Sequence, residues 1–403
     1  MSTQAPGNAI LVVNAGSSSL KFSVFRETGD GDAAVAINGQ ISGIGTEPKF
    51  EARDPDRRPL ADRAWGTGEP SDRTALLRYL LDWVEDHLDG AKLLAAGHRV
   101  VHGGARYSHP VLLTPAVIEE LTRLVPLAPL HQPHNLAAIR ALAEAHPELP
   151  QVACFDTAFH RGQPWQSQTF ALPRAMTEEG IRRYGFHGLS YEYIARRLPE
   201  MAPELAQAHV VVCHLGSGSS MCAIRAGKSV DSTMGFTAVD GLPMGTRTGR
   251  LDPGVLIYLM RAKGMGADDL EKLLYNQSGL LGVSGISNDM RVLLESADPR
   301  AAEAVELFCH AVAKETGSLA ASMGGLDAIV FTAGIGERSA PVRARVAEKL
   351  SWLGVKLDET ANAANGSKIS AADSRIPVWV IPTDEERMIA QHTMEVVEDA
   401  GPR

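Results

Sequence analysis

Cysteine is scarce in this 403-residue chain, and the spacing of the few cysteines argues against a zinc site. The four cysteines stand singly, with no C-x-x-C pair, at Cys154, Cys213, Cys222 and Cys309. Three of them lie in or beside apolar runs, so small core residues are a better interpretation than metal ligands.

Long apolar runs and a targeting segment are missing as well. No uninterrupted apolar stretch approaches the roughly 18 residues that a membrane span requires. The start of the chain, MSTQAPGNA, lacks the basic and apolar regions of a secretory signal. These absences predict a cytoplasmic protein without a membrane partner.

Basic residues are outnumbered by acidic ones. Lys and Arg total 39 against 48 Asp and Glu, which gives a net charge of −9 at pH 7. Affinity for nucleic acid comes largely from Lys and Arg on phosphates, so this balance disfavours a nucleic-acid partner. It does not exclude a small anionic substrate, because such a site needs only a few locally placed cations.

The chain is too long for one hydrophobic core, and it alternates predicted strands with predicted helices. The length predicts two domains, and the alternation predicts α/β layers. Helices are predicted over 73–88 and 299–323, after Asp252-Pro253, and from Asp384 onward. A buried strand is predicted at 151–155 and a last strand at 377–383.

One short motif occurs twice, about half the chain apart. ILVVNAGSSSLKFSVF at 10–25 and VVVCHLGSGSSMCAI at 210–224 both indicate strand, tight turn, strand. The shared turn residues are Gly16, Ser17 and Ser19 in the first copy and Gly216, Ser217 and Ser219 in the second. The repeat predicts a duplicated fold; chance is the alternative, since short Gly/Ser turns are common.

Two common nucleotide motifs are incomplete. The G-K-S at 227–229 is no P-loop, because the required first glycine would fall at Cys222. The pattern G-x-G-x-x-G fails after Gly216 and after Gly334, with Met221 and Ser339 where the last glycine should be. The two hairpins and a glycine turn at 333–337, directly after a strand, remain as candidates. Backbone N–H groups in such turns can bind anions. Each turn alone is more often only a turn, but three of them in one chain favour a phosphate site.

Eight motifs together resemble the acetate kinase family. In chain order they are NAGSSSLKF, GHRVVHGG, FDTAFH, YGFHG, HLGSGSS, MGTRTG, AGIGE and PTDEE. The resemblance covers essentially the whole chain and implies the actin-like (ribonuclease H-like) α/β fold, with two duplicated domains and an ATP cleft between them. It implies an N-terminal acyl-substrate domain, residues 1–159 plus 386–403, and a C-terminal nucleotide-binding domain, residues 160–385.

The resemblance further implies ATP-dependent phosphorylation of acetate to acetyl phosphate. Arg99 would bind the carboxylate, for which the guanidinium fork is suited, while Arg247 and His187 would stabilise the phosphoryl group in transfer. Asp156 would be the family's catalytic acid. Because acetate is already ionised near neutral pH, we expect Asp156 to orient Arg99 and water on the metal rather than act as a base. His131 matches another active-site histidine.

The remaining implied site residues fall into three groups. The resemblance also implies a homodimer. The methyl group of acetate would lie among Val101, Leu130, Phe186 and Ala238. The contacts of ATP or ADP would be Lys21, His214, Leu215, Gly216, Ser217, Gly218, Asp289, Met290, Arg291, Gly334, Ile335, Gly336, Glu337 and Arg338. The ligands of Mg²⁺, with Mn²⁺ as the alternative ion, would be Asn14 and Glu385.

Three positions depart from the family pattern, and several interpretations stay open. Ser217, Arg338 and Asp384 stand where the family usually has Asn; Asp384 adds negative charge near the implied metal and predicts altered Mg²⁺ affinity. Without the resemblance, Arg99 would be interpreted as a surface residue and His187 as a core or turn histidine. Asp156 would be interpreted as a helix-cap or turn aspartate. The nearest alternative function is a propionate kinase. An actin-like ATPase would need no carboxylate-binding arginine, and a non-catalytic nucleotide-binding regulator would be expected to have lost a charged group of the set.

Overall fold

The computed structural model describes residues 7–16, 18–28, 33–66, 69 and 71–401, so Ser17 of the first predicted turn lies outside the described residues. The chain forms two compact units, Met1–Ala158 with Asp384–Arg403 (unit 1) and Phe159–Thr383 (unit 2). The units change at 158/159 and 383/384, against predicted domain boundaries at 159/160 and 385/386. Glu385 therefore belongs to unit 1.

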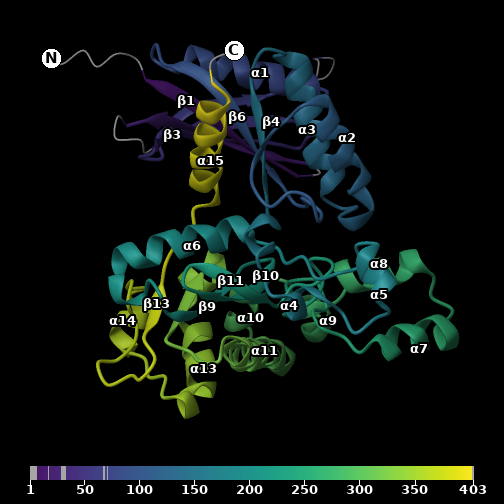
Figure 1. The fold of residues 1–403 in the computed structure, drawn as a ribbon, viewed down its shortest axis with the longest axis vertical. Helices are drawn as coiled ribbons and strands as arrows, with labels where there is room; N and C mark the ends of the chain where they lie inside the picture. Colours follow the sequence, from purple (N-terminus) through teal and green to yellow (C-terminus); the bar gives the residue numbers. More distant parts are fainter. Residues whose placement is uncertain (1–6, 17, 29–32, 67–68, 70, 402–403) are drawn as a thin grey trace. The chain divides into compact units, whose positions relative to one another are not determined.

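Unit 1 is built on a mixed eight-stranded sheet in the order β5-β4-β3-β2-β1-β6-β8-β7 (Figure 1). Its strands are β1 (Asn8–Ala15), β2 (Leu20–Glu27), β3 (Ala33–Ser42), β4 (Lys49–Arg53), β5 (Pro59–Ala64), β6 (Lys92–Val100), β7 (Val111–Leu112) and β8 (Gln151–Phe155). Its helices are α1 (Arg73–Asp86), α2 (Pro115–Arg123), η1 (Val125–Leu127), α3 (Gln132–Ala145) and α15 (Glu385–Ala400).

Helices cover both faces of this sheet. The apolar stripe of α1 packs with α3 onto one face, where Leu11, Val13 and Ala96 point. The C-terminal helix α15 packs against β6, β1 and β8 on the other face. A Cβ at Gly97 of β6 would lie 2.2 Å from Thr393 Oγ1 and 2.6 Å from Ile389 Cγ2, so only glycine permits this close approach of α15.

Unit 2 is built on a five-stranded sheet in the order β11-β10-β9-β12-β13. Its strands are β9 (His209–Leu215), β10 (Ser219–Arg225), β11 (Lys228–Ser232), β12 (Ala328–Thr332) and β13 (Val378–Val380). Its helices are α4 (Trp165–Gln168), α5 (Arg174–Glu178), α6 (Gly188–Met201), η3 (Pro203–Leu205), α7 (Pro253–Lys263), α8 (Ala267–Asn276), α9 (Gly279–Ser284), α10 (Met290–Glu295), α11 (Pro299–Met323), α12 (Ala333–Arg338), α13 (Ala340–Lys349), η4 (Ser351–Leu353) and α14 (Glu359–Ala363), and η2 (Ala158–His160) begins at the unit boundary.

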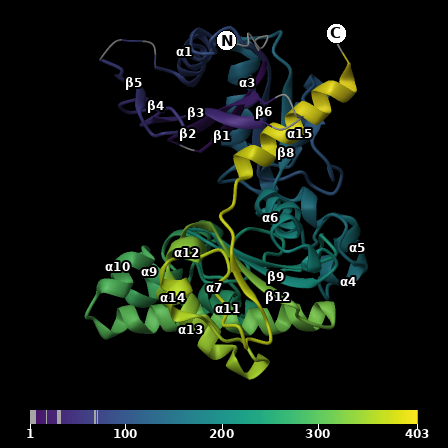
Figure 2. The same cartoon turned by 90° about the vertical axis from the view of Figure 1, so that its left-hand side faces the viewer.

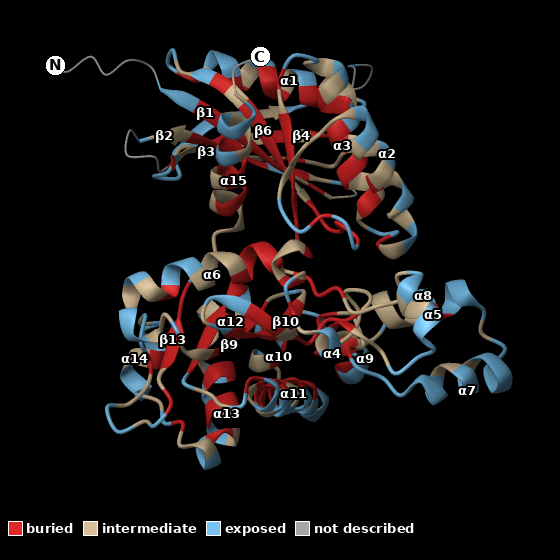
Figure 3. Cartoon of the chain, viewed as in Figure 1, coloured by how far each residue is buried: buried red, intermediate tan, exposed pale blue. Residues whose placement is uncertain are grey.

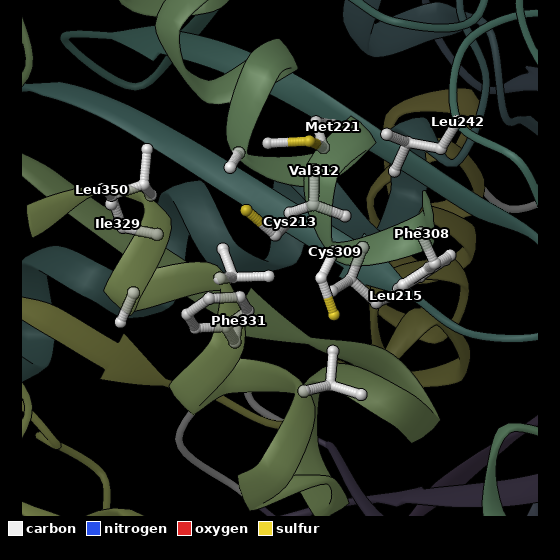
Figure 4. Close-up of a cluster of buried hydrophobic side chains, with 14 of the residues drawn as sticks. Cys213, Leu215, Met221, Leu242, Phe308, Cys309, Val312, Ile329, Phe331 and Leu350 are labelled. Atoms are coloured by element: carbon white, nitrogen blue, oxygen red, sulfur yellow. The ribbon is translucent and has the colours of Figure 1, made fainter. Parts of the chain in front are cut away.

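Unit 2 has the same layered arrangement. Helices α11 and α13 pack on one face of the sheet and α6 on the other, as Figure 2 shows. Strands β9, β10 and β12 are buried except at His209 and Arg225 (Figure 3). Cys213 and Cys309 lie in the core between α11 and the sheet (Figure 4), and all four cysteines are buried, which confirms the prediction that they are core residues.

The two sheets repeat one topology. In unit 1, β3-β2-β1 are antiparallel neighbours and β1-β6-β8 are parallel ones. In unit 2, β11-β10-β9 are antiparallel and β9-β12-β13 are parallel. Both sheets thus contain five strands that follow the order 3-2-1-4-5 with the same directions. The predicted α/β fold with duplicated halves is confirmed. Each sheet contains the predicted β-turn-β unit, which opens unit 1, but in unit 2 the helices from α4 to η3 come before β9.

Several element predictions can be compared with the structure. Helix α11 spans Pro299–Met323 as predicted, because Asp298 caps its start and Gly324, with φ of 79°, ends it. The glycine turn predicted at 333–337 is wrong: these residues form the short helix α12 directly after β12. Two glycines weaken a helix, but they do not prevent a short helix that begins directly at the end of a strand. The last strand is shorter than predicted, covering Val378–Val380.

Among the described segments, no helix combines the length and the hydropathy that crossing a bilayer demands.

Candidate active site

In unit 1, the central feature is a buried arginine–aspartate pair. Arg99 lies on β6 and Asp156 directly follows the parallel neighbour β8, so both are near the carboxyl ends of adjacent strands. Nε of Arg99 donates to Asp156 Oδ1 at 2.9 Å and Nη2 donates to Oδ2 at 2.6 Å. The Asp156 side chain is 3 % exposed and that of Arg99 is 22 % exposed. The aspartate thus holds one edge of the guanidinium and leaves another edge with unused N–H groups.

A second carboxylate joins this pair. Glu385, the first residue of α15, places Oε2 at 3.4 Å from Arg99 Nε. Burial, together with the charge of Glu385, raises the pKa of Asp156 to about 6, although Arg99 opposes the shift. The two carboxylates also raise the pKa of Arg99 against the opposing effect of burial. Two acidic groups facing one cation leave a net negative charge at this place.

The neighbouring Glu386 of α15 is held by a residue of β2. Its Oε2 accepts from Ser23 Oγ at 2.6 Å, and Ser23 Oγ also lies 2.7 Å from Asn38 Oδ1. Burial raises the pKa of Glu386 above its ordinary value. Asp384 caps α15 by accepting a hydrogen bond from Arg387 N at 2.9 Å. Aspartate therefore serves as the N-cap here as well as the asparagine that is usual in the family.

The other residues predicted in unit 1 lie on its first hairpin and on the segments after β6. Asn14 and Lys21 are register partners on β1 and β2; Asn14 is half-buried and Lys21 is exposed. Val101 is buried, and its N–H donates to Asn135 Oδ1 at 3.2 Å. Leu130 is 40 % exposed, and His131 is the N-cap residue of α3.

In unit 2, the turn between β9 and β10 brings several predicted residues together. Gly216 N–H donates to Gly218 O at 3.2 Å and to Ser219 Oγ at 3.2 Å. A Cβ added at Gly218 would lie 3.4 Å from His187 Nε2 and 3.7 Å from Arg247 Nη1. One imidazole and one guanidinium therefore converge on a glycine of the turn.

Local structure explains how these two side chains reach the turn. His187 caps α6 with φ of 58° and ψ of 26°, a left-handed conformation that is uncommon for a residue with a side chain. Its ring stacks on that of His214 with centroids 4.1 Å apart and 16° between the planes. Arg247 is oriented by a hydrogen bond from Nη1 to Ala238 O at 3.2 Å. Phe186 is buried, and its carbonyl oxygen lies 3.0 Å from His160 Nε2.

The short helix α12 begins beside the same turn. A Cβ at Gly216 would lie 3.7 Å from Ala333 Cβ, and one at Gly336 would lie 3.4 Å from Cys213 O. The main chain of the turn and the glycines of α12 are therefore closely packed. Ser217 O accepts from Gly245 N at 3.4 Å, which brings the MGTRTG segment to the turn as well.

The remaining nucleotide residues form two local structures. Asp289 caps α10 and pairs with Arg291, Oδ2 to Nη2 at 2.6 Å; the hydrogen bonds from Arg291 lower the pKa of Asp289 to about 2. Arg338 ends α12, and Glu337 Oε1 accepts from Thr383 N at 3.1 Å.

The sequence did not reveal several residues that hold these groups. Arg343 of α13 is fully buried and donates from Nη1 to the carbonyl oxygens of Gly336 and Glu337, at 2.9 and 3.0 Å, which ties down the end of α12. Ser220 and Tyr191 contact His187 directly or through one another. The motif HLGSGSS includes Ser220 but gave it no role, and none of the motifs contains Tyr191 or Arg343.

Each unit therefore gathers its own part of the predicted set. Fold and local geometry define a duplicated α/β protein in which unit 1 carries an arginine flanked by carboxylates and unit 2 carries a glycine turn flanked by nitrogen donors. The model of the acetokinase family matches residues 9–391, and the chain belongs to this family.

Named relatives agree with this assignment. The chain is 55 % identical to the acetate kinase of Nitrobacter hamburgensis over 392 residues, covering 97 % of both chains, and 52 % identical to that of Rhodopseudomonas palustris, covering 97 % and 99 %. Among solved structures, it is similar to a propionate kinase from Francisella tularensis, with 37 % identity, a TM-score of 0.88 and coverage of 96 % and 98 %. It is also similar to the Porphyromonas gingivalis acetate kinase, with 36 % identity, a TM-score of 0.86 and coverage of 97 % and 100 %.

Proposed function

We propose that this protein transfers the γ-phosphoryl group of ATP to acetate, forming acetyl phosphate and ADP, and catalyses the reverse reaction. A carboxylate oxygen of acetate forms a bond to the γ-phosphorus, and the bond from that phosphorus to the β–γ bridging oxygen breaks. The bond electrons leave with ADP, and no proton needs to be removed from the acceptor. Membership of the acetokinase family and the names of its relatives support this reaction.

The observation that carries the proposal is the convergence of His187 Nε2 and Arg247 Nη1 on Gly218. Phosphoryl transfer requires donors aimed at the oxygens on which charge is spread, together with a main chain that lets phosphate approach closely. In the proposed function, His187 and Arg247 donate to the transferred group. The turn at 214–218, α12 and the Asp289–Arg291 segment bind the nucleotide.

Arg99 binds the carboxylate of acetate in this proposal. Asp156 already occupies the Nε–Nη2 edge of the guanidinium, so the N–H groups on the Nη1 side are available for a second, two-point contact. Asp156 is then a positioning residue, which fixes the plane of Arg99 without touching the reacting atoms.

The donor set of unit 1 is suited to Mg²⁺. Asp156 and Glu385 together outweigh the charge of Arg99, and oxygen ligands are what this ion prefers. The described residues contain no cluster of three or more His, Cys, Asp or Glu that could hold a metal by itself. Asn14 and Glu385 are the proposed ligands of an ion that arrives with the nucleotide, or of Mn²⁺ in its place. When bound, the metal would neutralise phosphate charge.

Propionate is the second candidate substrate, because residue 238 is an alanine. The family commonly has proline there, and alanine lacks two of the ring carbons, which would set back the wall beside the carbonyl group that Arg247 contacts. One additional buried methylene would contribute about 0.8 kcal/mol if it fits. The branched side chain of Val101 would narrow the same pocket, so we propose propionate as a substrate that is slower than acetate.

We further propose a homodimer in the cytoplasm. Helix α7 has no buried residue along Pro253–Lys263, and its Val255, Ile257, Tyr258 and Met260 are 38–58 % exposed (Figure 3). An apolar helix this exposed favours association with a second copy. The mass of the purified protein in solution tests this.

The test of the proposed reaction is trapping of the acyl phosphate. Purified protein is incubated with ATP, Mg²⁺, hydroxylamine and either acetate, propionate or no acid. We expect acetohydroxamate at the highest rate, propionohydroxamate at a lower rate, and neither without acid. ADP formation at an equal rate without acid would contradict the proposal and support an ATPase.

A further inference from the structure

Two buried hydroxyl groups lead to the ring of His187. Nδ1 of His187 lies 2.8 Å from Ser220 Oγ, and Ser220 Oγ lies 2.5 Å from the hydroxyl of Tyr191. Ser220 is on β10 and Tyr191 on α6, and both are 0 % exposed. Burying a polar group without a partner is costly, so this chain of hydrogen bonds is an integral part of the site rather than a surface contact.

The direction of these hydrogen bonds decides which ring nitrogen of His187 carries a proton. A phenolic O–H is a stronger acid than an alcohol, and an imidazole nitrogen accepts more readily than a phenol oxygen. Both preferences favour Tyr191 donating to Ser220 Oγ, and Ser220 donating to Nδ1. In the neutral ring, the proton then resides on Nε2.

Nε2 is the atom that faces the glycine turn, at 3.4 Å from the position of a Cβ on Gly218. With a proton there, His187 donates to an anionic oxygen at the turn. With the other tautomer, it would present a lone pair, which repels such an oxygen. The tautomer therefore decides whether His187 attracts or repels an anionic oxygen at the glycine turn.

His214, which stacks on His187, has the same arrangement. Thr383 Oγ1 donates to Ser190 Oγ at 2.8 Å, and Ser190 Oγ lies 2.8 Å from His214 Nδ1. Both stacked rings thus have Nδ1 at the end of a pair of hydroxyl groups. Two independent occurrences of the same order argue that the hydroxyl pairs serve to set the ring tautomer.

We propose that Tyr191 and Ser220 form a hydroxyl relay that fixes the Nε2–H tautomer of His187 and makes both of them positioning residues for phosphoryl transfer. The use of His187 in transfer rests on the function proposed above. The tautomer itself does not, so the two can fail separately.

The direct test is the nitrogen spectrum of the histidine rings in the complete protein without substrate. Protein labelled with ¹⁵N-histidine is compared with His187→Ala, and the missing signals identify the ring of His187. We expect Nδ1 to resonate as an unprotonated nitrogen and Nε2 as a protonated one at neutral pH. A protonated Nδ1 in the wild-type ring would overturn the proposal, whatever reaction the protein catalyses.

The kinetic test removes the first hydroxyl of the relay and asks whether the effect passes through His187. Tyr191→Phe keeps the ring in the core and should lower kcat by roughly 5–30-fold, less than the 10²–10³ expected for loss of a donor itself. The KM for ATP should stay within about twofold. In the His187→Ala background, the same change should alter kcat by less than about twofold.

The matched control is Tyr184→Phe, which deletes a hydroxyl that donates to Gly180 O at 2.8 Å and does not touch the relay. It should leave kcat and the spectrum of His187 unchanged. An equal loss of kcat from Tyr191→Phe in both backgrounds, or no loss with an unchanged tautomer, would overturn the relay. Ser220→Ala interrupts the same chain if Tyr191→Phe does not fold, and it should shift the tautomer in the same way.

Discussion

At the scale of single residues, two arginines have different roles in the proposed reaction. In the proposed reaction, Arg99 of unit 1 would bind the acceptor carboxylate, and Arg247 of unit 2 would stabilise the transferred group. Changing either to Ala should lower kcat/KM by roughly 10²–10³, the range for removal of one such donor. The control is Arg78→Ala, an exposed arginine on α1. Near-wild-type turnover in Arg99→Ala or Arg247→Ala, measured as hydroxamate formation, would refute the role assigned to that residue.

Glu385 carries the prediction about the metal. Glu385→Gln preserves the shape of the side chain but removes one of the two negative charges beside Arg99. If Glu385 is the proposed ligand, the magnesium concentration needed for half-maximal activity should rise, since the ion would lose a charged ligand. Glu398→Gln on the exposed side of the same helix should not alter it. Equal magnesium dependence of both variants would mean that Glu385 acts only on Arg99 or on the start of α15.

Ala238 carries the prediction about the acid. Discrimination over one methylene rarely exceeds roughly 1–3 kcal/mol, so we expect acetate to exceed propionate by about tenfold or less in kcat/KM. Ala238→Pro retains the carbonyl oxygen that accepts from Arg247 and adds bulk. It should penalise propionate more than acetate. If the ratio of the two acids does not move, residue 238 does not contact the acyl group.

At the scale of elements, α15 depends on one glycine of the strand beneath it. Gly97→Ala would place a Cβ at 2.2 Å from Thr393 Oγ1, so α15 must shift, at a cost of about 1–3 kcal/mol in the free energy of unfolding. Gly317→Ala in α11 is the control: a Cβ there meets nothing within 4 Å, and alanine should be neutral or stabilising by up to about 1 kcal/mol. Urea unfolding measures both. Equal stability of the two variants would contradict the close packing of α15.

Helices with capping residues at both ends could be located from the sequence. Elements whose structure depends on tertiary packing could not. Asp298-Pro299 and Gly324 define both ends of α11 locally, so the sequence alone locates it. The residues of α12 carry two glycines and no local helix signal, and the buried Arg343 holds the end of this helix from α13. Likewise, the motif around His187 indicated the histidine but not Ser220 or Tyr191, which reach it only through tertiary packing of β10 and α6.

At the scale of the whole molecule, two buried neutral histidines make stability depend on pH. Burial lowers the pKa of His98 in unit 1 and of His160 in unit 2 to about 4. The unfolded chain binds protons at these rings from about pH 6.5 downward, whereas the folded units do not until about pH 4. The contribution of each ring to stability is therefore complete above about pH 6.5. It declines as the pH falls from there to about 4, by roughly 3 kcal/mol per histidine, and declines no further below that.

Replacement of one ring tests this dependence. His160→Gln should weaken the decline in the urea midpoint of unit 2 between pH 7 and pH 5. His109→Gln, at an exposed histidine, should leave the decline as in the wild type. The same slope in the wild type and both variants would show that carboxylates alone set the acid sensitivity.

The most direct test of the proposed phosphotransferase is to follow an oxygen atom from acetate to phosphate. Acetate labelled with ¹⁸O in the carboxylate is incubated with the protein, ATP, Mg²⁺ and hydroxylamine, and the released phosphate is analysed by mass spectrometry. Attack by the carboxylate on the γ-phosphorus places one acetate oxygen in the acyl phosphate bridge, and hydroxylamine then attacks the carbonyl carbon. We expect phosphate that carries one ¹⁸O atom for each hydroxamate formed. Phosphate without ¹⁸O would mean that water is the acceptor, and would contradict the proposed reaction.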